Sequence, residues 1–326
     1  MERFFRPLLG VCVAALGLTA AHVQAQATAQ AYPNRQIQMI VTGPPGGGSD
    51  LVARQMAQAL SVGLAQPVIV VNKPGGGGVI AHDFVAKSAP DGYTIFLATS
   101  GHPVHPYLHK KLPYDAQKDF VPIAKIGGAP FYLMASAGTG VKTLVDFKAY
   151  VARTPDKVSF AVADPTTWMA TSVFLSAMRM KDALLVNFKG TGPAMNDVAA
   201  GHVPFFIVPA ATVLPFRGSG RVLVVGAASS KRSALFPEVP TLEEQGTKVE
   251  SEVWYCLLAP ANTPEAVLDR LSAEVEKALR QPELVDKLRV SAIEPAVVTR
   301  QQFTAFMKEE HTRAREWAKE AKPEAQ

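Results

Sequence analysis

Gly43-Pro44-Pro45-Gly46-Gly47-Gly48-Ser49-Asp50 is the stretch that decides the fold. It follows an apolar run at residues 37–42, and apolar residues at helical spacing follow it. The same arrangement comes again: an apolar run at 68–71 leads into Pro74-Gly75-Gly76-Gly77-Gly78, and a helix is predicted over 79–88. A third strand is predicted over 93–98. Strands and helices that alternate with short connections predict an α/β fold with a parallel sheet and right-handed crossovers.

The rest of the chain continues the alternation. A length of 326 residues favours two domains. Capping boxes at Thr241 with Glu244 and at Thr299 with Gln302 predict two helix starts, and Thr263-Pro264 predicts a third. Further strands are predicted over residues 131–135, 158–162, 203–208, 222–227 and 253–258.

Composition excludes several classes of protein. Hydrophobic residues make up 48% and charged residues 19%, which is typical of a globular chain and not of a disordered one. The 33 basic and 28 acidic residues are mixed along the chain without a basic block, so nucleic acid is not an expected partner. Two cysteines make neither a disulfide framework nor a four-cysteine zinc site. Cys256 lies in an apolar strand pattern and is predicted to be a packed, inert thiol rather than a nucleophile.

The N-terminus has the layout of a secretory signal peptide. Arg3 and Arg6 precede an uncharged apolar stretch at 8–21, and Val23-Gln24-Ala25 places small residues before a cleavage site. We therefore expect residues 1–25 to be removed by cleavage after Ala25. The alternative is an uncleaved membrane anchor, which the shortness of the apolar stretch disfavours because a span needs about 20 residues.

The two glycine-rich loops predict a site for an anion. Each follows a strand and precedes a helix, where free N–H groups and the helix dipole favour negative charge, although both loops can also be read as plain turns. A phosphate loop needs a lysine where Ser49 stands, so nucleotide hydrolysis is disfavoured. A partial dinucleotide fingerprint at 76–81 lacks the acidic residue expected after the next strand. Small carboxylates remain, bound by backbone N–H groups and by the hydroxyls of Ser49, Thr99 and Ser100.

Residues suited to catalysis or metal binding are few. The sequence contains neither a nucleophile motif of the G-x-S-x-G type nor a zinc motif of the H-E-x-x-H type. His102, His105 and His109 are candidate metal ligands by their spacing, but two prolines interrupt the segment, so they are predicted to lie at the surface or at a cleft edge. Asp50 is predicted to serve the helix start, with a role as general base as the alternative. No metal and no cofactor are predicted.

Several motifs together resemble one family, the Bug (TctC-like) extracytoplasmic solute receptors of tripartite tricarboxylate transporters in Gram-negative bacteria. The resemblance covers nearly the whole chain after the signal peptide. The matching segments share their order along the chain as well as their residues. They are Tyr32-Pro33, 43–50 with Ala53-Arg54, 71–78, 89–94, 111–115 with 118–120, 189–194, 237–241, 258–261 and Thr263-Pro264.

The resemblance implies a two-lobed periplasmic-binding-protein fold of the Venus-flytrap type, each lobe a mainly parallel sheet flanked by helices. Lobe 1 would span 32–128 plus 222–326, and lobe 2 would span 129–221. Ligand carboxylates would be held mainly by backbone N–H groups in the cleft. Carried over by motif, the ligand contacts of lobe 1 would be Pro45, Gly46, Gly47, Gly48, Ser49, Asp50, Gly75, Gly76, Gly77, Gly78, Ser100 and Gly101. In lobe 2 the matching loop contributes Thr191.

Lobe 2 departs from the family pattern at two places. The loop that usually reads Gly-Asn-Gly-Ser is replaced by a segment from which Asp164, Thr166, Thr167 and Trp168 are taken as ligand contacts. The strand that usually ends with an acidic residue ends here with Pro209. Trp168, Met169 and the strand at 205–209 either form an apolar pocket wall for an aromatic acid or only pack the lobe, and both interpretations stay open.

The sequence thus predicts a monomeric periplasmic protein that captures a small organic carboxylate, either a di- or tricarboxylate or an aromatic acid. It would deliver the ligand to the membrane permease subunits of a tripartite tricarboxylate transporter, without catalysis. The alternatives are an exported enzyme of the same fold that uses Asp50 or a histidine as base, and a sensor component that signals through a membrane partner.

Overall fold

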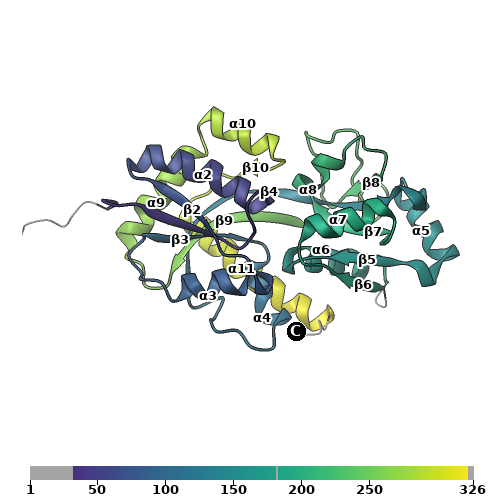
Figure 1. The fold of residues 1–326 in the computed structure, drawn as a ribbon, viewed down its shortest axis with the longest axis horizontal. Coiled ribbons are helices and arrows are strands. Elements are labelled where there is room, and N and C mark those ends of the chain that lie inside the picture. The colour runs from purple at the N-terminus through teal and green to yellow at the C-terminus, as the bar shows by residue number, and fades with distance from the viewer. Residues whose placement is uncertain (1–31, 181–182, 322–326) are drawn as a thin grey trace, which may run out of the picture. The chain divides into compact units, whose positions relative to one another are not determined.

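The computed structural model describes residues 32–180 and 183–321, so the predicted signal peptide lies outside the described residues. The fold is mixed α/β, and its strands follow the order β2-β1-β3-β9-β4-β7-β5-β6 (Figure 1). The strands are β1 (Ile37–Val41), β2 (Val68–Asn72), β3 (Thr94–Thr99), β4 (Phe120–Ser136), β5 (Ser159–Val162), β6 (Leu184–Asn187), β7 (Phe205–Pro209), β8 (Val222–Ala227), β9 (Glu252–Pro260) and β10 (Glu294–Pro295).

The parallel pairs confirm the β-α-β-α-β prediction. β1 pairs in parallel with β2 and β3, and β5 pairs in parallel with β6 and β7. Each parallel group is completed by antiparallel strands that the sequence did not predict in full, above all β4, of which only residues 131–135 were expected. Gly127 and Gly128 obscured its first half. A Cβ on Gly127 would lie 2.4 Å from the Glu294 carbonyl oxygen, so the glycine is needed where β10 approaches.

Strands β4 and β9 connect the two groups. The first half of β4 pairs with β9, and β9 pairs with β3. The second half of β4 pairs with both β7 and β8. The pairing therefore places β8 in the same sheet as β5, β6 and β7. The predicted division of the chain into two lobes at 129 and 222 stays a prediction.

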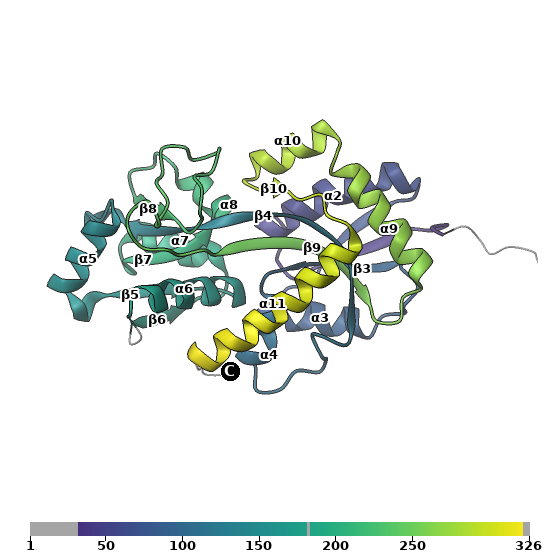
Figure 2. The same cartoon turned by 180° about the vertical axis from the view of Figure 1, so that it is seen from behind.

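Helices cover both faces of the sheet around β1 and β3. In Figures 1 and 2 one face carries α2, α9 and α10, and the other carries α3, α4 and α11. Their apolar stripes point inward; on the second face Ala81, Val85, Phe303 and Met307 pack against Phe96 and Cys256 of the strands. The helices of this part are α2 (Gly48–Leu64), α3 (Val79–Ala86), α4 (His105–Leu108), α9 (Glu265–Ala278), α10 (Pro282–Val290) and α11 (Arg300–Ala321).

The group around β5 carries its own helices. They are α5 (Leu144–Arg153), α6 (Pro165–Ala177), α7 (Thr191–Ala200) and α8 (Ala210–Val213). Its core is aromatic: the rings of Phe147, Phe160, Phe174 and Phe205 lie with centroids 4.9–6.2 Å apart. Within the described residues no helix is both long enough and apolar enough to cross a membrane.

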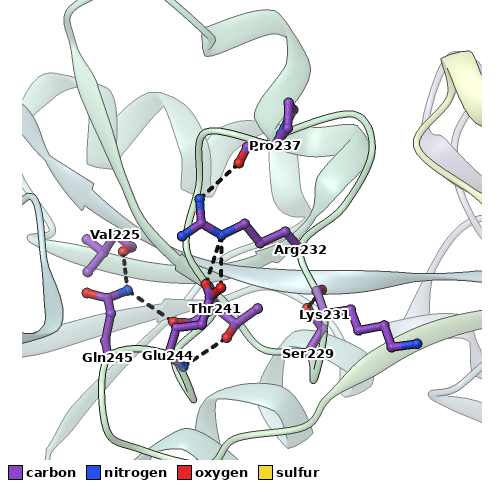
Figure 3. Close-up of polar contacts among 8 residues, drawn as sticks. All are labelled: Val225, Ser229, Lys231, Arg232, Pro237, Thr241, Glu244 and Gln245. Carbon is purple, nitrogen blue, oxygen red and sulfur yellow. Dashed lines mark hydrogen bonds and ion pairs between the residues drawn. The ribbon is translucent and has the colours of Figure 1, made fainter.

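The segment between β8 and β9, residues 228–251, is ordered by polar contacts instead of a helix (Figure 3). Thr241 and Glu244 form the predicted reciprocal bonds, at 2.7 and 3.0 Å, but they close a turn, so the predicted helix is wrong. Arg232 donates to both carboxylate oxygens of Glu244 and to the Pro237 carbonyl. Gln245 donates to the Val225 carbonyl and so ties the turn to β8. Prolines and Gly246 on either side leave too few residues for a helix.

Candidate functional site

The site is built at the ends of β1, β2 and β3. Because these three strands are parallel, their carboxyl ends lie at one edge of the sheet, where ligands bind in open α/β sheets. The loops that follow the strands are the segments singled out in the sequence. They are 43–50 after β1, 73–78 after β2, and Ser100-Gly101 after β3.

Asp50 organises the first loop from the inside. Asp50 is 2% exposed. Its carboxylate accepts hydrogen bonds from the Gly46 N–H, Arg54 Nε and Asn72 Nδ2, each at 2.9 Å. Asn72 also donates to the Gly43 carbonyl at 2.9 Å. Burial raises the pKa of Asp50, but the bonds from Arg54, Gly46 and Asn72 outweigh it and hold the pKa below its ordinary value. The carboxylate therefore serves the loop, as predicted for the helix start, and sequence reasoning missed Arg54 and Asn72.

The start of α2 leaves backbone donors free. Its N-cap is Gly47, two residues before Ser49, and no side chain caps the helix. The Gly46 N–H bonds Asp50 and the Gly47 N–H bonds the Pro44 carbonyl at 3.2 Å. The N–H groups of Gly48 and Ser49 have no partner among the described residues. They are thus available to an anion at the positive end of the helix dipole.

The second loop has a left-handed backbone throughout. The φ values are positive at all four glycines: 124° at Gly75, 58° at Gly76, 61° at Gly77 and 105° at Gly78. Residues other than glycine rarely adopt such values. The Gly78 N–H bonds the Gly75 carbonyl at 3.0 Å, whereas the other three N–H groups have no partner among the described residues. Gly75 to Gly77 are exposed. The loop therefore offers a second set of backbone donors.

A buried histidine cluster lies against this loop. His82 Nδ1 lies 2.8 Å from the Gly78 carbonyl oxygen, and its Nε2 lies 3.1 Å from His102 Nδ1. His105 bonds the Tyr114 hydroxyl at 2.7 Å. His102 and His105 are 2% and 3% exposed, so the prediction that they lie at the surface or at a cleft edge is wrong. Pro103, which lies between them, is buried as well.

Burial keeps these rings uncharged. It lowers the pKa of His82 to about 4, and it lowers the pKa values of His102 and His105 well below the ordinary value. Among the described residues no group of three histidine, cysteine or acidic side chains is placed to hold a metal ion. Cys256 is fully buried, and burial raises the pKa of its thiol, as expected for an inert cysteine.

The third loop meets the start of α6. A Cβ on Gly101 would lie 3.2 Å from Thr166 Cγ2 and 3.3 Å from Pro165 Cβ, so this glycine allows the two segments to touch. Next to it, Ser100 is 1% exposed, and its hydroxyl oxygen has no hydrogen-bond partner among the described residues. The predicted residues Gly101 and Thr166, which come from different parts of the chain, are thus brought together.

The start of α6 is closed by a side-chain capping box. Asp164 is the N-cap, and its Oδ1 accepts from the Thr167 N–H at 2.9 Å and from the Thr166 hydroxyl at 2.5 Å. The Thr167 hydroxyl in turn accepts from the N–H groups of Ala163 and Asp164. Thr167 is therefore a structural residue with 0% exposure, whereas Asp164 is partly exposed.

Tyr255 was missed by sequence reasoning, because it stands in a strand pattern that reads as core. It lies opposite Thr99 in the β3–β9 pair and is 4% exposed. Its hydroxyl oxygen lies 3.7 Å from the position of a Cβ on Gly48. Burial, and after it the Asp164 carboxylate, raises the pKa of Tyr255. The hydroxyl thus lies close to the start of α2.

Three predicted contacts of the second group lie in different surroundings. Trp168 packs edge-on against Trp317 of α11, with ring centroids 5.5 Å apart, in an apolar cluster with Val104 and Ala314. Pro209 is buried and pairs with Phe131. Thr191 begins α7 after Gly190, whose φ is 117°. The geometry of Trp168 favours the packing interpretation of this side chain.

Comparison with known proteins shows which family and which solved structures the chain resembles. Residues 52–322 match the model of the tripartite tricarboxylate transporter family receptor, TctC. Solved structures that resemble the chain include the periplasmic binding protein BugD, with 30% identity, a TM-score of 0.81, and coverage of 90% of this chain and 100% of that one. MatC from Rhodopseudomonas palustris with bound malate has 29% identity, a TM-score of 0.79 and coverage of 88% and 99%. Rpa4515 from R. palustris with adipate has 28% identity, a TM-score of 0.83 and coverage of 89% and 98%.

The match extends over most of the chain and confirms the resemblance seen in the motifs. The structural neighbours confirm the fold class, since they are periplasmic binding proteins with the same α/β architecture. The members of this class are solute-binding receptors. The chain belongs to the TctC family of solute-binding receptors.

Proposed function

We propose that the protein captures a small organic carboxylate at the carboxyl ends of β1, β2 and β3. The observation that carries the proposal is the set of unpartnered backbone donors at two neighbouring strand ends, Gly48 and Ser49 in one loop and Gly75 to Gly77 in the other. Backbone N–H groups fit carboxylate oxygens, and because the loops hold them in place, little conformational entropy is lost on binding. The ligands of the two R. palustris neighbours, malate and adipate, support this class of ligand.

Positive side chains have a small part in this binding. Lys73 is the single lysine or arginine in the two glycine-rich loops, and its Nζ lies 3.9 Å from the ring centroid of Phe84. Arg54 is engaged by Asp50. The ligand charge is therefore met by backbone dipoles, and each hydrogen bond to a charged acceptor contributes roughly 1.5–3 kcal/mol.

The two lobes predicted from the sequence close around the ligand. The contact between Gly101 and the start of α6 supports this, because a ligand at the strand ends then has a residue from each lobe beside it. A ligand shifts the balance of open and closed forms only by its greater affinity for the closed form. Small-angle scattering with and without saturating ligand tests closure, and identical profiles would contradict it.

Capture serves uptake in this proposal. The protein is exported by a signal peptide cleaved after Ala25, acts as a monomer in the periplasm, and delivers the ligand to the permease subunits of a tripartite tricarboxylate transporter. Family membership supports the transporter role. N-terminal sequencing of periplasmic material should find Gln26 first. Deletion of the gene should abolish uptake of the ligand at low concentration, and restoring the chain should restore uptake.

The binding proposal is tested by calorimetric titration of the purified protein with a panel of mono-, di- and tricarboxylates, supported by native mass spectrometry. At least one acid should bind with a dissociation constant in the micromolar range or below, equivalent to about −8 kcal/mol or stronger. A panel in which neutral amides bind as tightly as the matching acids would contradict an anion site.

A further inference from the structure

The start of α6 contains a carboxylate without a counter-charge. Asp164 Oδ1 is occupied by the Thr166 hydroxyl and the Thr167 N–H, but Oδ2 accepts no hydrogen bond from any described residue. That oxygen is not among the buried unpartnered atoms, so it reaches open space. No lysine, arginine or histidine within the described ranges forms an ion pair with Asp164. Asp164 is thus a negative acceptor that keeps one free oxygen.

Asp50, the acid at the start of α2, differs from Asp164 in its partners. The Asp50 carboxylate is neutralised by Arg54 at 2.9 Å and turned into its own loop. It presents neither charge nor a free oxygen to a ligand bound at the start of α2. Asp164 therefore contributes the unbalanced negative charge beside the strand ends.

A chain of contacts connects Asp164 with the anion-binding loops. Asp164 bonds Thr166, and Thr166 touches the position of a Cβ on Gly101, just after β3. Two residues before Gly101, Thr99 lies opposite Tyr255, whose hydroxyl lies near Gly48 at the start of α2.

Tyr255 adds a second group that lacks a partner. The residue is more than nine-tenths buried, yet its hydroxyl has no described hydrogen bond and is not among the sealed, unpartnered atoms. The oxygen therefore keeps some solvent exposure, and it lies 3.7 Å from the position of a Cβ on Gly48 at the start of α2.

The charges restrict what a ligand can place near Asp164. A ligand carboxylate held at the start of α2 is attracted by the N–H groups, whereas a second carboxylate beside Asp164 would meet a like charge at low effective dielectric. A hydroxyl or an ammonium group there donates to the free oxygen of Asp164, and the ammonium also balances its charge. The Tyr255 hydroxyl can donate to the carboxylate or accept from the same ligand donor.

We propose that the protein selects carboxylic acids that carry a hydrogen-bond donor close to the bound carboxylate, an amino or hydroxy acid, and that Asp164 is the specificity-determining residue that binds this donor. The inference rests on the proposed function, because it concerns the same site. It changes the expected ligand from a plain dicarboxylate or aromatic acid to a substituted one.

Two matched series of acids test the proposal by calorimetric titration of the wild-type protein. Succinate, L-malate and L-aspartate share two carboxylates and a four-carbon chain, and they differ only in the hydrogen, hydroxyl or ammonium at carbon 2. Glutarate, L-2-hydroxyglutarate and L-glutamate form the same series with one more carbon. In the series that binds, the donor-bearing acids should bind at least about tenfold more tightly than the unsubstituted acid. The order of hydroxyl and ammonium distinguishes the two kinds of donor.

The variant Asp164→Asn tests the residue itself. Asparagine also caps helices, so the fold should be retained, and Asp164→Ser is a second neutral capping variant. Either variant should lose most of the advantage of the ammonium acid, about tenfold, and should bind the unsubstituted acid as well as wild type or better. Asp146→Asn is the matched control, since Asp146 stands in the capping box of α5. Its ranking of the acids should equal that of wild type.

The outcomes distinguish failure of the inference about Asp164 from failure of the proposed carboxylate-binding function. If wild type binds the unsubstituted acid as tightly as the donor-bearing acids, or if neither Asp164 variant changes the ranking, the inference is overturned and the carboxylate site stands. If none of the six acids binds, but other plain carboxylates do, the inference is likewise overturned. If no carboxylate binds at all, the proposed function fails and the inference fails with it.

Discussion

Helices α2 and α6 each follow a strand, but their first turns are built in opposite ways. The N-cap of α2 is Gly47, which offers no side chain, and the N–H groups of Gly48 and Ser49 are free. The N-cap of α6 is Asp164, which forms a full capping box with Thr167. A capping side chain occupies one of the first donors of a helix, whereas an uncapped start keeps that donor for an anion. Of these two starts, α2 is the one suited to hold a carboxylate, and α6 presents an acceptor.

The largest expected effect comes from making α2 resemble α6. Gly47→Asp places a capping carboxylate where the ligand anion would bind. The backbone there has φ −74° and ψ 164°, which suits an aspartate N-cap. We expect ligand affinity to fall by about 100-fold or more, equivalent to ~2.7 kcal/mol, while the melting temperature stays equal or rises.

Calorimetric titration and thermal unfolding of the same samples measure the two opposite effects. Gly47→Asn is the matched control, because it caps without charge and should cost less affinity. A new Cβ at this position would lie 3.2 Å from the Pro44 carbonyl oxygen, a contact that both variants share. If Gly47→Asp binds as well as wild type, the start of α2 does not hold the anion.

The second effect concerns the acid that supports α2. Asp50→Asn removes a buried charge that receives three hydrogen bonds, and it should lower the free energy of unfolding by about 1–2 kcal/mol at pH 7. This figure is below that of a fully buried pair because Arg54 is 54% exposed. Urea unfolding of both proteins measures the difference.

The pH dependence of that difference has a definite sign. The folded-state pKa of Asp50 lies below the ordinary value of 3.8, so its stabilising effect is present above that value and is lost as the pH falls through the folded pKa. The gap between wild type and Asp50→Asn should therefore be constant from pH 7 to about 5 and should narrow below about pH 4. A gap that widens on acidification would contradict the assigned bonds.

The same comparison explains what the sequence could and could not predict. The anion-binding character of the start of α2 was predictable because its donors are backbone N–H groups. A glycine-rich segment after an apolar run indicates such exposed N–H groups. The bonds of Asp50 to Arg54 and Asn72 were not predictable, since Asn72 lies 22 residues away and reaches the loop only through the β1–β2 pairing.

The histidines and the first half of β4 show the same limit. His102 and His105 were expected near the surface because prolines flank them, yet they pack against His82 and Tyr114. Of the long antiparallel strand β4 only residues 131–135 were predicted, because Gly127 in its first half is required by Glu294, a neighbour from the far end of the chain. Wherever a residue's environment comes from distant segments, local pattern was insufficient.

The third prediction concerns the other backbone loop. Gly78 has φ 105°, and a Cβ there would lie 3.1 Å from the buried His105 ring and 3.3 Å from Thr42. Gly78→Ala should therefore displace the loop and reduce ligand affinity by about tenfold, since a non-glycine residue at positive φ costs roughly 1–2 kcal/mol. Gly138→Ala is the control, because that glycine has open space around it and no positive φ. Equal affinities of the two variants would show that the second loop does not contribute donors.

The smallest expected effect is that of Tyr255→Phe, which removes one oxygen close to the start of α2. Because the hydroxyl has no protein partner among the described residues, no hydrogen bond within the fold is lost, and the melting temperature should stay within about 1 °C of wild type. Affinity for the acid that wild type binds most tightly should fall by about three- to tenfold, since one neutral hydrogen bond contributes roughly 0.5–1.5 kcal/mol. Tyr150→Phe on α5 is the matched control and should change neither quantity. If Tyr255→Phe unfolds at a lower temperature and binds normally, the hydroxyl serves the fold, and the two helix starts meet the ligand without it.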